Sequence, residues 1–140
     1  FKMSKLTVND YPLYEHRPDL IKTVTGKTLN EITIEAVLND ELSEYDVRIS
    51  PEVLELQAQI AEGAGRWFVA ANLRRAAELT KVPDDKVMFI YDALRPNRCT
   101  EAQMEAIARD LEENYGAKLN AELVREASEA YKGRGFLNEE

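Results

Sequence analysis

The sequence predicts an all-α protein, a small helical domain with an extended N-terminal arm. From residue 28 onwards, helix-starting residues are repeatedly followed by apolar side chains at helical spacing. No segment shows the sustained two-residue alternation of a half-buried strand. The first 27 residues are apolar but follow neither period. We therefore expect an arm over residues 1–27 and one helical domain over residues 28–140, a length typical of one domain.

The arm contains Pro12 and Pro18 among apolar side chains at irregular spacing. Disordered tails are poor in such side chains, so we expect the arm to lie extended on a surface, either its own domain's or another subunit's. It holds five basic and three acidic residues, whereas residues 28–140 hold 13 and 23. Tyr11, Leu13 and Tyr14 are its predicted anchors to a partner, because aromatic side chains bury large areas at low entropic cost.

Local start signals predict the helices of the middle of the chain. Thr33 is the expected cap of a short helix over residues 34–39, and residues 43–46 predict a short turn. The Ser-Pro-Glu sequence at residues 50–52 is a strong start, since Ser accepts a backbone N–H and Pro needs no donor at the first position. That helix should end at the Gly-Ala-Gly sequence of residues 63–65. Its expected inward residues are Val53, Leu56, Ile60 and Ala61.

Four more helices are predicted, over residues 66–79, 83–94, 100–116 and 121–132, the last one stopped by Gly133. Apolar residues three and four positions apart define their expected inward faces. These residues are Val69, Leu73, Ala76 and Ala77; Val87, Ile90, Tyr91 and Leu94; Met104, Ile107, Ala108 and Leu111; and Leu123, Ala127, Ala130 and Tyr131.

Composition excludes several classes of function. A net charge of -8 repels phosphate backbones, so we expect no nucleic-acid partner. The apolar runs are far shorter than the roughly 20 residues of a membrane span, and no signal peptide opens the chain, so we expect a cytoplasmic protein. The chain holds one His, His16, and one Cys, Cys99, with neither a CxxC nor an HExxH motif. We therefore predict no catalytic, cofactor-binding or metal-ligating residue.

Two features indicate a protein interface. Trp67 and Phe68 are adjacent, so on a helix they point about 100° apart and cannot share one apolar stripe. Arginines cluster around them and around residue 95, in an otherwise acidic chain. Aromatic residues and arginine are enriched at interfaces, although a wide apolar stripe with solvated charges is the alternative. The predicted interface residues are Tyr11, Leu13, Tyr14, Arg48, Arg66, Trp67, Arg75, Arg95 and Pro96.

Short segments in a fixed order carry a family resemblance from Asp10 to about Tyr131. The densest are RRAAELT at 74–80, VPDD at 82–85 and IYDALRP at 90–96; the others are DYPL at 10–13, KTL at 27–29, ITIEAVL at 32–38, DVRIS at 46–50, LQAQIA at 56–61, IARDLE at 107–112 and VREA at 124–127. Together they resemble the small (γ) subunit of adenosylcobalamin-dependent diol and glycerol dehydratases. The number of ordered matches makes this more specific than any single motif.

The resemblance implies an αβγ enzyme, a dimer of heterotrimers, that converts 1,2-diols or glycerol to the aldehyde and water by a radical route. In such enzymes the large subunit is a β/α barrel that holds the substrate and its metal ion. Adenosylcobalamin lies between the large and medium subunits, so the resemblance implies a cofactor bound by the partners and not by this chain. The small subunit would pack on the large one and stabilise it.

Three questions stay open at this point. The sequence does not distinguish glycerol from 1,2-propanediol as the substrate, because selectivity would reside in the large subunit. It does not show whether the complex is enclosed in a bacterial microcompartment. The alternative function, from a different class, is a stand-alone helical adaptor that binds a protein partner unrelated to any enzyme.

Overall fold

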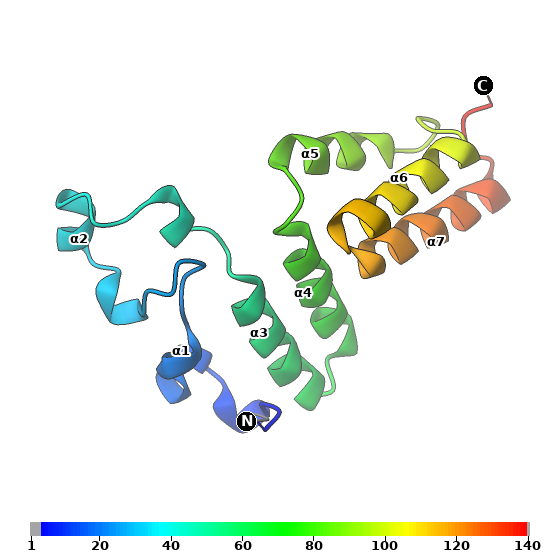
Figure 1. The fold of residues 1–140 in the computed structure, drawn as a ribbon. Helices are drawn as coiled ribbons and strands as arrows, with labels where there is room; N and C mark the ends of the chain where they lie inside the picture. The colour runs from blue at the N-terminus through cyan, green and yellow to red at the C-terminus, as the bar shows by residue number, and fades with distance from the viewer. Residues whose placement is uncertain (1–3, 140) are drawn as a thin grey trace. The chain divides into compact units, whose positions relative to one another are not determined.

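The computed structural model describes residues 4–139, so residues 1–3 of the predicted arm lie outside the described part. Within residues 4–139 the chain forms seven α-helices, four short 3-10 helices and one isolated β-bridge, between Lys22 and Thr28 (Figure 1). The predicted all-α class is confirmed. The α-helices are α1 (Leu13–His16), α2 (Ile34–Leu38), α3 (Pro51–Gly63), α4 (Trp67–Leu79), α5 (Asp84–Ala93), α6 (Glu101–Tyr115) and α7 (Lys118–Arg134). No helix of the described residues is both long and apolar enough to cross a bilayer.

The chain divides into two compact units, the first covering Phe1–Ala77 and the second Glu78–Glu140. The division falls inside α4 and not at residue 27, where the sequence predicted the end of the arm. The segment taken as the arm therefore belongs to the same unit as α2, α3 and most of α4. Each unit has hydrophobic residues of its own at its centre.

The arm is not a plain extended segment. It contains the 3-10 helices Val8–Asp10 and Pro18–Leu20 on either side of α1, each too short to show a helical period in the sequence. Leu6 and Leu13 are buried against Ile60 of α3. The Leu6 N–H donates to Gln59 Oε1 at 3.1 Å. The arm therefore packs on α3 of its own unit.

The start of α3 is the one that the sequence predicts. Ser50 Oγ accepts the N–H of Val53, and Pro51 occupies the first turn. Small side chains then pack α3 against α4, with Ala58, Ala61 and Ala70 buried and Leu73 partly buried beside them. The guanidinium of Arg74 joins the two helices through Glu55 at 3.1 Å and Glu62 at 2.6 Å.

The second unit has the larger hydrophobic cluster. Its centre consists of Val82, Ile90, Met104, Ala108, Leu111, Ala117, Ala121 and Val124. Helix α6 begins at the predicted Thr100–Gln103 capping box and ends at Gly116, whose φ is 62°. Helices α6 and α7 then form a hairpin (Figure 1), which Arg125 of α7 joins to Glu105 at 3.2 Å and to Glu112 at 3.0 Å.

Two predicted features of α7 are wrong. The helix begins at Lys118 and not at residue 121, because the Glu78 carboxylate accepts the N–H groups of Leu119 and Asn120, each at 2.9 Å. This capping residue lies about 40 positions away in sequence, where a local pattern cannot reveal it. Gly133 lies inside α7 and does not stop it; the C-terminal cap is Gly135, with φ 71°.

Several residues expected to face inward are exposed. On α5, Ile90 is buried as predicted, but Tyr91 is 74% exposed. On α4 the buried residue is Ala70, whereas Val69 is 45% exposed. The remaining outward residues of this kind are Ala76, Leu123 and Ala130. The helical period is therefore correct, but some apolar residues lie on a face that no other part of the unit covers.

Candidate subunit interface

Beyond the arm, the large apolar side chains that are more than half exposed lie in three places among the described residues. The first is the segment of residues 34–49, the second is the start of α4, and the third is α5. The side chains more than half exposed there are Ile34, Val37, Leu38, Tyr45, Val47 and Ile49; Trp67 and Phe68; and Met88, Phe89 and Tyr91. Extensive apolar exposure marks an interaction surface more often than a free one.

The apolar side chains at the start of this segment stay exposed because α2 is too short to bury all of them. Thr33 Oγ1 caps the helix by accepting the Ala36 N–H at 3.1 Å, as predicted. Only Ala36 of the five helical residues is buried, and Ile34 and Leu38 are each more than three-quarters exposed. A five-residue helix is marginal by itself in water, so a covering partner would stabilise it.

Asp46 holds this segment in place. Its buried carboxylate accepts the Ser43 N–H at 2.7 Å, the Thr25 hydroxyl, and the ammonium of Lys27 at 3.0 Å. The Thr25 hydrogen bond, followed by those from Ser43 and Lys27, lowers the pKa of Asp46 far below its ordinary value. Lys27 also donates to the Glu41 carbonyl. These contacts tie residues from the arm to the segment that carries the exposed apolar side chains.

A groove of about 430 Å³ lies beside this segment in the first unit, and we call it the first groove. Its apolar lining residues are Ile21, Leu29, Ile32, Val47, Ile49, Val53 and Leu54. Lys22, Lys27, Asp46 and Arg48 also line it. The Arg48 guanidinium lies 5.1 Å from the centre of the Tyr45 ring, within cation–π range.

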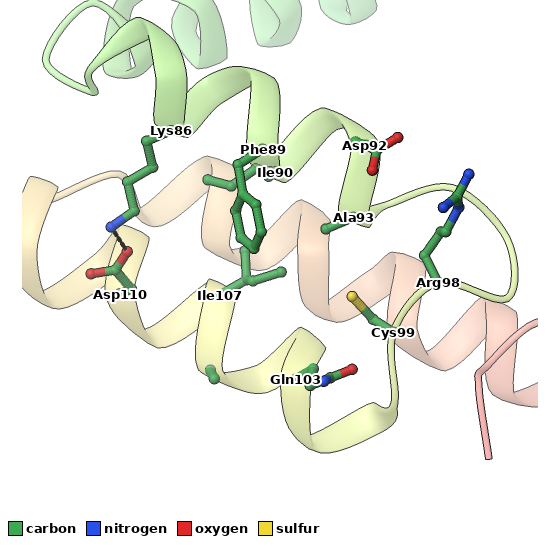
Figure 2. Close-up of a pocket in the computed structure, with 11 residues that line it drawn as sticks. Lys86, Phe89, Ile90, Asp92, Ala93, Arg98, Cys99, Gln103, Ile107 and Asp110 are labelled. Carbon is green, nitrogen blue, oxygen red and sulfur yellow. Dashed lines mark ion pairs between the residues drawn. The ribbon is translucent and has the colours of Figure 1, made fainter. Parts of the chain in front are cut away.

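A second groove, of about 570 Å³, lies between α5 and α6 in the second unit (Figure 2). Phe89 points from α5 toward Ile107 of α6 across it. An ion pair between Lys86 and Asp110 lies at one end; the hydrogen bond between them raises the pKa of Lys86 and lowers that of Asp110. The groove is therefore apolar in its middle and polar at its ends.

Arg98, Cys99 and Gln103 lie at the other end of this second groove (Figure 2). Burial is the main factor that raises the pKa of the Cys99 thiol, and a raised pKa keeps the sulfur protonated and weakly nucleophilic. Among residues 4–139 no group of three or more His, Cys, Asp or Glu side chains could hold a metal ion.

The predicted arm anchors separate into two kinds. Tyr11 and Tyr14 are 68% and 62% exposed and available to a partner. Leu13 is 6% exposed and packs beside Ile60, so in this structure it stabilises its own unit and is not presented to a partner. Successive residues of a helix point about 100° apart, so Leu13 and Tyr14 of α1 face different surroundings. Residue type alone does not reveal which of the two is buried.

The other predicted interface residues lie in several places. Arg48 lines the first groove, while Arg66 and Trp67 are exposed where α4 begins. Arg75 is half-buried and donates to the Asn72 side chain. Arg95 pairs with Asp92 of α5 at 3.4 Å and is exposed, as is Pro96 beside it. Arg48, Arg66, Trp67 and Arg75 belong to the first unit, and Arg95 and Pro96 belong to the second.

Sequence reasoning missed most of the exposed apolar residues. Residues 34–38 carry four apolar side chains in a helix of five residues, and no such helix can turn all of them inward. That signal was present in the sequence. Met88 and Phe89 give a similar signal of exposure. They lie between Val87 and Ile90, which face inward, so on a helix they must face another way.

Comparison with known proteins gives consistent matches. The family model described as "Dehydratase small subunit" matches residues 6–138. The propanediol dehydratase small subunit of Citrobacter freundii is 52% identical over 130 residues, which are 93% of this chain and 76% of that protein. The propanediol dehydratase small subunit of Salmonella typhimurium is also 52% identical over 130 residues, 93% of this chain and 75% of that protein.

Proposed function

Because the chain belongs to the dehydratase small-subunit family, we propose that it is the small, non-catalytic subunit of an adenosylcobalamin-dependent diol dehydratase. The enzyme would convert 1,2-propanediol, and glycerol as a second substrate, to the aldehyde and water. The chain would pack on the large barrel subunit and stabilise it, in a dimer of heterotrimers that also contains a medium subunit.

The exposure of the apolar residues 34–49 is the observation that carries the packing role. Six large apolar side chains in this segment of the first unit stay open to solvent, while Asp46 holds the segment in a defined conformation. A Val, Leu or Ile side chain of this set contributes at most about 1.5–3 kcal/mol when a partner buries it fully. Permanent complexes have large, apolar interfaces of this kind.

The cofactor is assigned to the partner subunits. His16 is the one imidazole in the sequence, and imidazole is the commonest metal ligand among side chains. It is exposed at the end of α1 and lines neither groove. We therefore propose a structural role for this chain and no step of the radical reaction.

The stand-alone adaptor is not favoured, since both relatives that share 52% identity are named as subunits of an enzyme. We choose 1,2-propanediol as the first substrate because those names refer to it. A cytoplasmic location, with or without enclosure in a microcompartment, remains part of the proposal.

Reconstitution tests the proposed function. Large and medium subunits from the same source are purified with and without this chain, supplied with adenosylcobalamin, and assayed for aldehyde from 1,2-propanediol and from glycerol. We expect the complete complex to be active, the complex without the chain to be depleted in activity or assembly, and the chain alone to give no aldehyde. Turnover by the chain alone, or full activity and stability without it, would refute the proposal.

A variant pair connects this test to the apolar segment. Ile34→Ser with Leu38→Ser removes two exposed apolar side chains of α2, and Glu35→Gln changes an exposed residue of the same helix as the control. We expect the double variant to be retained less by the large subunit and the control to be retained like the wild type. Equal retention of both would show that α2 is not part of the interface.

A further inference from the structure

The first groove is positively charged in a chain that is negative overall. Three cationic side chains line it, Lys22, Lys27 and Arg48, and one carboxylate, Asp46, whereas the whole chain carries a net charge of -8. The Asp46 carboxylate is already bound by Lys27 at 3.0 Å. The charges left to act on a partner are therefore those of Lys22 and Arg48.

Neither of these two cations forms an ion pair with a carboxylate in the described part of its unit. Across residues 4–139 the structure shows no ion pair between a carboxylate and Lys22 or Arg48. Lys22 acts at longer range on Asp19, but the Asp19 carboxylate is bound by the Arg17 guanidinium at 3.2 Å. A partner carboxylate would thus meet two cations without displacing an existing ion pair.

The position of Arg48 is defined by its neighbours. Its guanidinium lies over the Tyr45 ring at 5.1 Å, and the intervening Asp46 is held by Ser43, Thr25 and Lys27. A side chain that is ordered before binding loses less conformational entropy on binding. Arg48 is therefore placed to receive a carboxylate at the groove.

The rest of the groove is apolar and accessible. Val47 and Ile49 are 73% and 67% exposed, and Leu29 and Ile32 line the groove with them. Apolar contact supplies affinity, and charge complementarity selects the partner and its orientation. A phosphate-rich polymer fits poorly, because the other residues of the chain would repel it.

We propose that the first groove binds an acidic, apolar segment of the large subunit, with apolar side chains against Val47 and Ile49 and carboxylates against Arg48 and Lys22. This inference rests on the proposed function and adds to it the chemistry of the partner segment and its place on this chain. The inference concerns the first groove alone and gives no role to the exposed apolar side chains of α4 and α5.

The experiment co-expresses the full chain with tagged large and medium subunits and measures how much small subunit is retained as NaCl rises from about 50 to about 500 mM. The test variant combines Lys22→Glu and Arg48→Glu. The matched control combines Lys81→Glu and Lys118→Glu, which changes the net charge equally at exposed lysines of the second unit. Circular dichroism verifies that both variants are folded.

We expect the groove variant to bind the large subunit about tenfold more weakly than the wild type. Its retention should not fall as salt rises, because the reversed charges repel the partner carboxylates and salt screens that repulsion. The control should bind within about twofold of the wild type. Arg48→Gln, which keeps a polar side chain and removes its charge, should show an intermediate loss even where the double variant folds poorly.

The outcomes separate the inference from the proposed function. If the wild-type chain is not retained by the large subunit, the proposed function fails. If the wild type is retained and the groove variants bind as well as the control, the proposed function stands and docking at the groove is refuted. An equal loss in the test and control variants would also refute it, because net charge and not the groove would then be responsible.

Discussion

At the scale of single residues, Leu13 and Tyr14 show how adjacent positions acquire different roles. Both are apolar or aromatic residues of one short helix. Leu13 is buried beside Ile60 and Leu6, whereas Tyr14 is 62% exposed. The first contributes to the stability of the unit, and the second is available to a partner.

Substitution should separate these two roles. We expect Leu13→Ala to destabilise the first unit by about 2–4 kcal/mol, because it removes buried methyl groups and leaves a cavity. Tyr14→Ala should change stability by no more than about 0.5 kcal/mol and should reduce retention by the large subunit. Urea denaturation and pull-down measure the two effects. Equal destabilisation by both would show that Tyr14 also packs within its own unit.

Asp46 should make stability depend on pH. Its pKa is lowered in the folded state, from an ordinary value of 3.8, by the contacts with Thr25, Ser43 and Lys27. A carboxyl whose folded pKa is depressed stabilises the fold fully above its unfolded pKa, and that contribution is lost as the pH falls toward the folded pKa. We therefore expect Asp46→Asn to lower the melting temperature by a few degrees near neutral pH.

The difference between wild type and Asp46→Asn should stay constant above about pH 5 and shrink below about pH 4. Thermal melts at a series of pH values measure it. Glu44→Gln, which removes an exposed carboxyl from the 3-10 helix Glu44–Asp46 that also contains Asp46, is the control and should show little difference at any pH. A difference for Asp46→Asn that grows in acid would contradict the role given to its carboxylate.

At the scale of elements, the two glycines near the end of α7 differ in backbone conformation. Gly133 lies within the helix, and a Cβ added there would meet no atom within 4 Å. Gly135 adopts φ 71° as the C-terminal cap, a left-handed conformation that favours glycine. The boundary of the helix is therefore set two residues later than the first glycine.

Alanine at these positions should have opposite effects. Gly133→Ala should stabilise the second unit by about 0.5 kcal/mol, because alanine has the higher helix propensity. Gly135→Ala should destabilise it by about 1 kcal/mol, because the left-handed conformation crowds a Cβ. Urea denaturation of both variants measures the signs. Destabilisation by Gly133→Ala would instead indicate that the helix ends at Gly133.

At the scale of the whole molecule, the first unit depends on a segment that the sequence assigns to an arm. Leu6 and Leu13 cover Ile60 on α3, and Lys27 binds Asp46 at 3.0 Å. The arm is therefore part of the first unit, and it also presents Tyr11 and Tyr14 to a partner. The second unit has its own hydrophobic cluster, formed by residues after Ala77.

Removal of residues 1–27 should affect the two units unequally. We expect the amides of α3 to lose protection from hydrogen exchange, because Ile60 becomes exposed, while α6 and α7 keep their protection. Full-length Leu13→Ala should produce a weaker form of the same pattern. If α3 keeps its protection in the truncated chain, the arm contributes nothing to the unit, and contact with a partner is its sole role.

Most of the helical boundaries could be read from the sequence by itself. Ser50 with Pro51, Thr100 with Gln103, and Gly116 start or end helices through contacts with residues only a few positions away. Such signals are local, so a single sequence contains them. The ordered segments that carry the family resemblance are likewise a property of the sequence, and through that resemblance they indicated the small-subunit family.

The tertiary structure decided which apolar residues are buried. Tyr91 fits the helical period of α5 and is exposed, while Leu13 fits no period and is buried. It also decided the start of α7, through Glu78, and the division of the chain after Ala77. The physical reason is that burial and long-range capping depend on contacts between segments far apart in sequence, which no local spacing of residues encodes.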